Sequence, residues 1–175
     1  MQEESKTAQF EAIALPLFGA AYNLARWLVR DDHDAEDVVQ EAYLRAFSFF
    51  PGYRGGDSRS WLLTIVRNTC YTWLQQNRNQ ELAQVFDEDV HTVEDPSRNP
   101  EAVLLQGADA QLLRDALEKL PVEFREILVL REMEGMSYRE IADLAHIPVG
   151  TVMSRLARGR ERLQRQLTQA MKKEP

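Results

Sequence analysis

The chain has 175 residues, of which 21 are basic and 28 acidic, giving a formal net charge of −7. This length holds one ordinary domain or two small ones and excludes a large catalytic barrel. Hydrophobic residues make up 44% and charged residues 28%, a composition that suits a folded chain and excludes a disordered one. Cys70 is the only cysteine, which excludes an internal disulfide and a thiolate metal site.

The composition favours an all-α protein. The 8 glycines and 7 prolines are few, whereas the strong helix formers Leu, Ala, Glu, Arg and Gln are abundant. The N-terminal MQEESKTAQFEA is acidic and polar, unlike a signal peptide, and no run of eighteen apolar residues follows it. We therefore expect a soluble, cytoplasmic protein that needs no cofactor.

The negative charge lies almost entirely in the middle of the chain. Residues 1–80 contain 8 basic and 10 acidic side chains, residues 81–109 contain 1 and 8, and residues 110–175 contain 12 and 10. The middle segment also carries prolines and shows little helical periodicity before about residue 100. The sequence therefore predicts two small helical domains, at 8–80 and 110–172, joined by a flexible acidic linker at 81–109.

The C-terminal part contains a helix-turn-helix pattern. Ser137 and Glu140 have the spacing of a capping box, so a helix starts there. The pattern breaks at 146–148, and Pro148 suits the first turn of a second helix. Two short helices joined by a tight turn, with arginines on the second, are typical of a module whose second helix enters the DNA major groove.

An angle of 100° per residue divides the second helix into two faces. The expected core face contains Val149, Val152, Leu156, Leu163 and Leu167, and Gly159 should weaken this helix by about 1 kcal/mol relative to Ala. Arg160 falls near the apolar edge, and an amphipathic surface helix that binds nothing is the alternative. On the cationic face, Thr151, Ser154, Arg155 and Arg158 are best placed for bases, with Arg162 and Arg165 nearer phosphate or solvent.

Residues 34–50 predict an amphipathic helix in the N-terminal part. Its broad apolar face contains Val38, Val39, Ala42, Tyr43, Ala46, Phe49 and Phe50. Leu44 lies in the middle of the polar side, which is formed by Asp37, Gln40, Glu41, Arg45 and Ser48. Periodicity alone leaves two interpretations open: a solvated surface, or a docking face for a partner protein.

Residues 58–80 predict a second helix that has no acidic residue. The expected buried face contains Leu62, Ile65, Val66, Thr69 and Trp73, and the opposite face contains Ser60, Thr64, Arg67, Asn68, Tyr71 and Gln75, with Trp61 at its border. The preceding loop supplies Arg54 and Arg59 beside glycines. Such a polar, cationic and aromatic surface suits unstacked nucleic acid, and an ordinary core helix is the alternative.

Three sequence blocks, DAEDVVQEAYLRAF, YRGGDSRSWLLTIVRN and LPVEFREILVLREMEGMSYREIADLAHIPVGTVMSRLARGRERL, resemble the extracytoplasmic-function (ECF) group of bacterial sigma factors in the sigma-70 family. The resemblance implies region 2 at 8–80 and region 4 at 110–172, with core RNA polymerase, promoter DNA and an anti-sigma factor as partners. It implies a clamp-docking set, Asp37, Gln40, Glu41, Leu44 and Arg45, and a duplex-reading minus-thirty-five set, Thr151, Ser154, Arg155 and Arg158. The implied minus-ten set, which melts and reads single strand, is Arg54, Ser58, Arg59, Trp61, Arg67, Asn68 and Thr72.

The chain departs from the family pattern at a few positions. Arg78 is the one basic residue in QQNRNQ, Met153 stands where lysine is common, and Thr72 replaces a frequent aspartate.

The length of the linker limits how far apart the two domains can reach. A flexible coil of this length spans about 30 Å, so one chain that reads two promoter elements more than two helical turns apart requires a partner that extends the linker.

Two other classes of protein are alternatives to a sigma factor. A free-standing helix-turn-helix regulator should dimerise, but no dimerisation heptad is visible, so we expect a monomer.

An enzyme with a magnesium site could use the acidic cluster at 31–37, but acids at a helix start more often complement the helix dipole. His33, His91 and His146 are too scattered for a triad or metal site, and Cys70 is expected in the core. We therefore expect no enzyme activity and no metal.

Overall fold

The computed structural model describes residues 2–84 and 108–173, and within these ranges every regular element is a helix and no strand occurs. The all-α fold class is therefore confirmed. Most of the expected linker, residues 85–107, lies outside the described residues. We call residues 2–84 the N-terminal half and residues 108–173 the C-terminal half.

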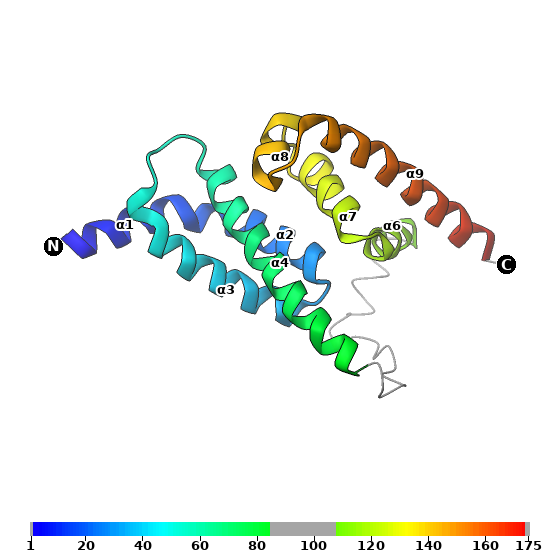
Figure 1. Cartoon of the computed structure of the whole chain (residues 1–175), viewed down its shortest axis with the longest axis horizontal. Coiled ribbons are helices and arrows are strands. Elements are labelled where there is room, and N and C mark those ends of the chain that lie inside the picture. Colours follow the sequence, from blue (N-terminus) through cyan, green and yellow to red (C-terminus); the bar gives the residue numbers. More distant parts are fainter. Residues whose placement is uncertain (1, 85–107, 174–175) are drawn as a thin grey trace.

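The N-terminal half is a bundle in which α2, α3 and α4 all contact one another, with α1 against α3 and α4 (Figure 1). Its first helix begins several residues before the expected boundary at residue 8. The elements are α1 (Gln2–Ala14), a short 3₁₀ turn (Leu15–Leu17), α2 (Phe18–Val29), α3 (Asp32–Phe49), a second 3₁₀ turn (Phe50–Gly52) and α4 (Ser58–Gln84).

The C-terminal half packs α6, α7 and α8 against the long final helix α9 (Figure 1). Its elements are α6 (Ala108–Lys119), α7 (Val122–Leu128), a π-helical turn (Val129–Met133), α8 (Tyr138–Ala145) and α9 (Val149–Lys173). The π turn continues α7, so Leu130 and Ile127 enter the same core as Leu156 of α9.

Small and branched side chains build the core of the N-terminal half. Leu24 of α2, Val38 of α3 and Leu62 of α4 are 0–1% exposed, and Ala42 and Ala46 let α3 approach its neighbours closely. Each fully buried aliphatic side chain contributes about 1.5–3 kcal/mol, so this packing outweighs helix propensity. Cys70 is also fully buried, as expected, and burial raises the pKa of its thiol to about 12.

The acidic cluster at 31–37 forms the start of α3. The Asp31 carboxylate accepts a hydrogen bond from the Asp34 backbone N–H at 3.0 Å, and Arg26 pairs with Asp32 at 2.6 Å. Burial, followed by the neighbouring Asp31 and Asp37, raises the pKa of Asp34. The cluster therefore caps a helix, and no group of metal-ligating side chains occurs within the part of the chain that the structure covers.

One segment, Gln2–Val29, is long and apolar enough to span a membrane, with a mean hydropathy of 1.3 in its best window. The 3₁₀ turn divides this segment into α1 and α2. The apolar residues Ala14, Leu24 and Leu28 are fully buried in the helical core. Packing inside the bundle buries 39% of the apolar window.

Gly159 lies where α9 crosses α7. A Cβ added there would lie 3.3 Å from Leu128 Cδ1 and 3.4 Å from Phe124 Cβ. The glycine, which helix propensity alone marks as a weak point, thus allows close helix packing. We expect Gly159→Val to lower the free energy of unfolding by about 1–3 kcal/mol through overpacking, measured by urea denaturation.

Ala157→Val is the matched control for that substitution, because Ala157 is exposed on the same helix. It introduces the same β-branched side chain and should cost only the difference in helix propensity, about 0.5 kcal/mol. Equal losses from the two variants would contradict the close packing of α9 on α7.

Candidate nucleic-acid and protein interfaces

The helix-turn-helix begins with the expected capping box. The Glu140 backbone N–H donates to the Ser137 hydroxyl at 3.1 Å, and the Ser137 backbone N–H donates to the Glu140 carboxylate at 3.0 Å. His146 ends α8 in the left-handed conformation, at φ 56°. The Pro148 carbonyl then accepts from Thr151 and Val152, so the turn leads directly into α9.

The amino-terminal turns of α9 have the two faces that periodicity predicts, with one exception. Val152 and Leu156 are at most 2% exposed, whereas Ser154 and Arg158 are exposed and Thr151 and Arg155 are partly exposed. The expectation that Val149 lies in the core is wrong, because its side chain is 39% exposed. Val149 lies in the first turn, where it borders an open groove beside Ser137 and Tyr138.

The remaining arginines of α9 have partners within the C-terminal half. Arg160 pairs with Glu132 at 2.6 Å, Arg165 pairs with Glu161 at 2.5 Å, and the Arg162 guanidinium lies 4.7 Å from the Phe124 ring centroid. Within the described ranges, Arg155 and Arg158 are the α9 arginines with neither an ion pair nor a contact with an aromatic ring. These two cations are therefore available to an external anion.

On α3, the side opposite the core carries an exposed leucine among charged groups. Leu44 is 72% exposed, Asp37 and Gln40 are exposed, and Glu41 pairs with Arg45 at 2.7 Å. Of the expected apolar face, Tyr43 is partly exposed and Phe49 is 58% exposed, so the expectation for Phe49 is wrong; the other members are buried. Phe49 is the last residue of α3, where the helix gives way to the 3₁₀ turn.

The loop between α3 and α4 is built on two glycines and an aspartate cap. Gly55 and Gly56 have φ of 87° and 88°, which glycine adopts readily. The Asp57 carboxylate accepts from the Ser60 backbone N–H at 3.2 Å and hydroxyl at 2.6 Å, and the hydroxyl contributes most to lowering the pKa of Asp57. This arrangement starts α4 at Ser58 and leaves Arg54 exposed.

Trp61 belongs to an aromatic cluster at the base of this loop. Its ring centroid lies 4.8 Å from that of Tyr53 and 6.3 Å from that of Phe50, and Trp61 is half-buried. It is therefore neither a free stacking platform nor a core residue.

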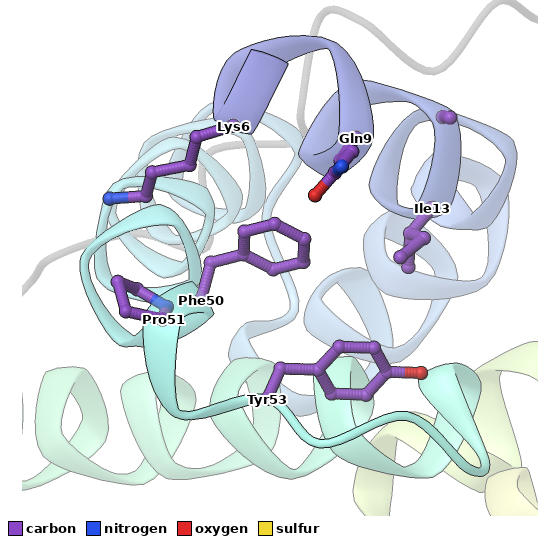
Figure 2. Close-up of a pocket in the computed structure, with 7 residues that line it drawn as sticks. Lys6, Gln9, Ile13, Phe50, Pro51 and Tyr53 are labelled. Atoms are coloured by element: carbon purple, nitrogen blue, oxygen red, sulfur yellow. The ribbon is translucent and has the colours of Figure 1, made fainter. Parts of the chain in front are cut away.

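A groove of about 670 Å³ opens beside the aromatic cluster. Figure 2 shows Phe50, Pro51 and Tyr53 facing Lys6, Gln9 and Ile13 of α1 across it. Sequence reasoning missed this groove because the two segments that form it are some forty residues apart in the chain.

Along α4, Asn68 and Thr72 are exposed, but Arg67 is not free. The Arg67 side chain is 15% exposed, and its Nε lies 2.5 Å from the Glu126 carboxylate of α7, which is fully buried. The Tyr71 hydroxyl donates to the same carboxylate at 2.6 Å, and the Arg67 guanidinium lies 4.0 Å from the Tyr71 ring centroid. Burial lowers the pKa of Arg67, but the bond to Glu126 and its charge produce a net rise.

Tyr71 responds to the same cluster, because burial and then the Glu126 charge raise the pKa of its hydroxyl. The hydroxyl therefore stays protonated at neutral pH and remains a hydrogen-bond donor.

The buried face of α4 differs from the predicted one at three positions. Leu63, which the sequence does not place in the core, is fully buried. Ile65 and Trp73, which the sequence predicts to be buried, are partly exposed.

Further contacts join the two halves around this cluster. The Arg59 guanidinium donates to the Glu134 backbone carbonyl, and the Asn23 amide donates to the Glu134 carboxylate at 3.2 Å. Ser58, which directly precedes Arg59 at the start of α4, is partly exposed. Of the minus-ten set, Arg54, Asn68 and Thr72 are thus exposed, whereas Arg59 and Arg67 are held by the C-terminal half.

Comparisons with known proteins identify both halves. Residues 17–80 match the family "Sigma-70 region 2", and residues 110–163 match "Sigma-70, region 4". The chain belongs to the ECF sigma factors of the sigma-70 family. Because a region 2 match precedes a region 4 match in one chain, the comparisons support a sigma factor and oppose a free-standing regulator.

Individual relatives of this chain are ECF sigma factors as well. It is 36% identical to the ECF RNA polymerase sigma factor SigE of Mycolicibacterium smegmatis over 81% of this chain, although it spans only 55% of that relative. It is 36% identical to the ECF RNA polymerase sigma-E factor of Escherichia coli K12, covering 73% of this chain and 71% of the relative.

A solved structure shows the same fold. The sigma factor RpoE of Bartonella quintana, in complex with the anti-sigma factor NepR, is 30% identical with a TM-score of 0.74, covering 91% of this chain and 97% of that one. Sigma factors bind core RNA polymerase and promoter DNA, and the relatives are transcription regulators rather than enzymes.

Proposed function

We propose that this sigma factor directs core RNA polymerase to its promoters through three separate surfaces and without covalent chemistry. Residues 8–80 act as region 2, residues 110–172 act as region 4, and residues 81–109 connect them. The observation that carries the proposal is that two different sigma-region families match the two halves of one fold, in order. As a transcription factor of this kind, the protein acts in the cytoplasm.

The proposed polymerase-docking surface is the outer side of α3. An exposed leucine surrounded by charges gives a small apolar contact with an electrostatic rim, which is the usual anatomy of a protein interface. Leu44 supplies the apolar contact and is 72% exposed. The rim consists of Asp37, Gln40, Glu41 and Arg45, and its acidic members favour a cationic partner surface.

The proposed minus-ten surface combines the loop before α4 with one side of α4. Asn68 and Thr72 are exposed one helical turn apart and offer hydrogen bonds to unstacked base edges. Trp61 and its aromatic neighbours lie at the loop base, and Arg54 is exposed beside the two glycines. Ser58, Arg59 and Arg67 complete the set.

The proposed minus-thirty-five surface is the amino-terminal part of α9. Arg155 and Arg158 are available to base edges or phosphates in the major groove, and Thr151 and Ser154 add hydroxyl groups. The buried Val152 and Leu156 fix the orientation of the helix, so these polar side chains project from its opposite side.

Run-off transcription tests the proposal. Purified factor added to core RNA polymerase on a genomic promoter library should produce start sites that core enzyme alone does not. Binding of an operator by the factor as a dimer, with no new start sites, would instead support a free-standing regulator. An anti-sigma factor is a further proposed partner, since RpoE of Bartonella quintana was solved in complex with one.

A further inference from the structure

Met153 is an exposed apolar side chain in the amino-terminal part of α9. It is 54% exposed, although Val152 and Leu156 on the same two turns are buried in the core. A single exposed apolar side chain is common on protein surfaces. Met153 is not single, because Val149 and Ala157, one helical turn to either side of it, are exposed as well. We call these three exposed residues the apolar stripe.

The apolar stripe forms one border of the surface that α9 offers to DNA. The direction of the core lies midway between Val152 and Leu156, which are both buried. At about 100° per residue, Met153 and Arg155 lie about 80° to either side of that direction, and Ser154 lies opposite it. The surface therefore has a cationic border on one side, an apolar border on the other, and a hydroxyl group between them.

Cations lie on both sides of the apolar stripe. Arg155 and Arg158 lie on one side and have no ion-pair partner in the described chain. On the other side, an open groove between the starts of α8 and α9 is lined by Val149, Arg131 and Arg139. Arg139 is exposed and takes part in none of the ion pairs of the described residues. Because arginines bind phosphates and set the register of a protein on the duplex, a stripe between them faces the bases.

The chemistry of Met153 differs from that of the polar side chains beside it. Methionine has no hydrogen-bond donor and only a weakly accepting sulfur, so it does not read the polar groups that distinguish most base edges. Its side chain is flexible and polarizable, and it fills irregular apolar gaps. The apolar group that the major groove presents is the C5-methyl group of thymine, which cytosine lacks. Thymine therefore matches the stripe better than the other bases do.

We propose that Met153 is a specificity-determining residue that selects a thymine in the minus-thirty-five element by contact with its C5-methyl group. This proposal rests on the minus-thirty-five role of α9 given above. Val149 and Ala157 extend the apolar surface on either side of the contact. Burial of one methyl group favours thymine by about fourfold over the same base without it, a smaller effect than a bidentate arginine contact provides.

Replacement of thymine by uracil tests the contact directly, because it removes only the C5-methyl group and leaves base pairing unchanged. Holoenzyme reconstituted from core polymerase and the wild-type factor first selects its preferred upstream element from duplexes randomised there. Each thymine of that element is then replaced singly by uracil, and promoter affinity is measured by filter binding. One replacement should weaken binding by the wild-type holoenzyme about fourfold and leave binding by the Met153→Ala holoenzyme unchanged.

Two further variants control for the loss of a side chain. Met153→Leu keeps an apolar side chain of similar volume and should retain the response to uracil. Met171→Ala removes the same side chain from another exposed position of α9, where Met171 is 67% exposed. It should respond to uracil as the wild type does. Surface substitutions of this kind change stability little, and circular dichroism checks that each variant is folded.

The proposal is overturned if no replacement by uracil weakens wild-type binding, or if the Met153→Ala holoenzyme responds to every replacement as the wild type does. Arg155→Ala and Arg158→Ala distinguish this failure from failure of the proposed function. If they still weaken promoter binding, α9 reads the element without the help of Met153. If neither does, α9 is not the minus-thirty-five reader and both proposals fail.

Discussion

Replacing Asp37 and Glu41 together with arginine is expected to abolish binding to core RNA polymerase and to leave the helical fold intact. Both carboxylates are exposed on the outer side of α3, beside the exposed Leu44. Reversing two rim charges places like charges opposite each other across the interface, which costs several kcal/mol. Co-purification with core polymerase measures the loss, and circular dichroism measures the helical content.

The fold should tolerate these changes because the two side chains make few contacts within the protein. Glu41 pairs only with its neighbour Arg45 among the ion pairs of the described chain, and a like-charge pair at that spacing costs about 0.2–0.5 kcal/mol. Glu4→Arg with Glu11→Arg makes the same change in net charge at exposed positions on a different helix, α1. Unchanged co-purification of the α3 variant, or equal loss from the α1 variant, would remove the docking assignment.

Local signals in the sequence were sufficient to predict the helix-turn-helix and the two-sided helices. The Ser137 capping box and the core positions Val152 and Leu156 follow from hydrogen bonding and helical period alone. The errors at Val149 and Phe49 share a physical cause, because both lie at helix ends where the neighbouring helix no longer covers the face that periodicity assigns to the core.

The contact between the halves could not be predicted in the same way. Periodicity places Arg67 and Tyr71 on the polar side of α4 but does not reveal which surface will cover that side. The one signal was in LPVEFREILVL, where Arg125 and Glu126 interrupt an apolar run. Both are fully buried because each satisfies groups of the N-terminal half, and that pairing joins residues more than fifty positions apart.

Replacing Arg155 or Arg158 by alanine should weaken promoter recognition without affecting the fold. Both residues lie in the amino-terminal part of α9, and neither forms an ion pair within the described chain. A good bidentate contact with a base provides about 1–3 kcal/mol of discrimination, so the expected loss of promoter affinity is roughly fivefold to 150-fold. Filter binding or run-off transcription with the reconstituted holoenzyme measures it on the cognate promoter.

Salt dependence distinguishes the two kinds of contact that these arginines can make. Removing an arginine that binds phosphate weakens binding to all DNA sequences about equally and lowers the slope of affinity against salt concentration by about 1. Removing an arginine that reads a base relaxes the sequence preference at a single position. Arg165→Ala is the matched control, because Arg165 is exposed further along α9 and is already paired with Glu161 at 2.5 Å. If both variants recognised the cognate promoter as well as the Arg165→Ala protein does, α9 would not be the minus-thirty-five reader.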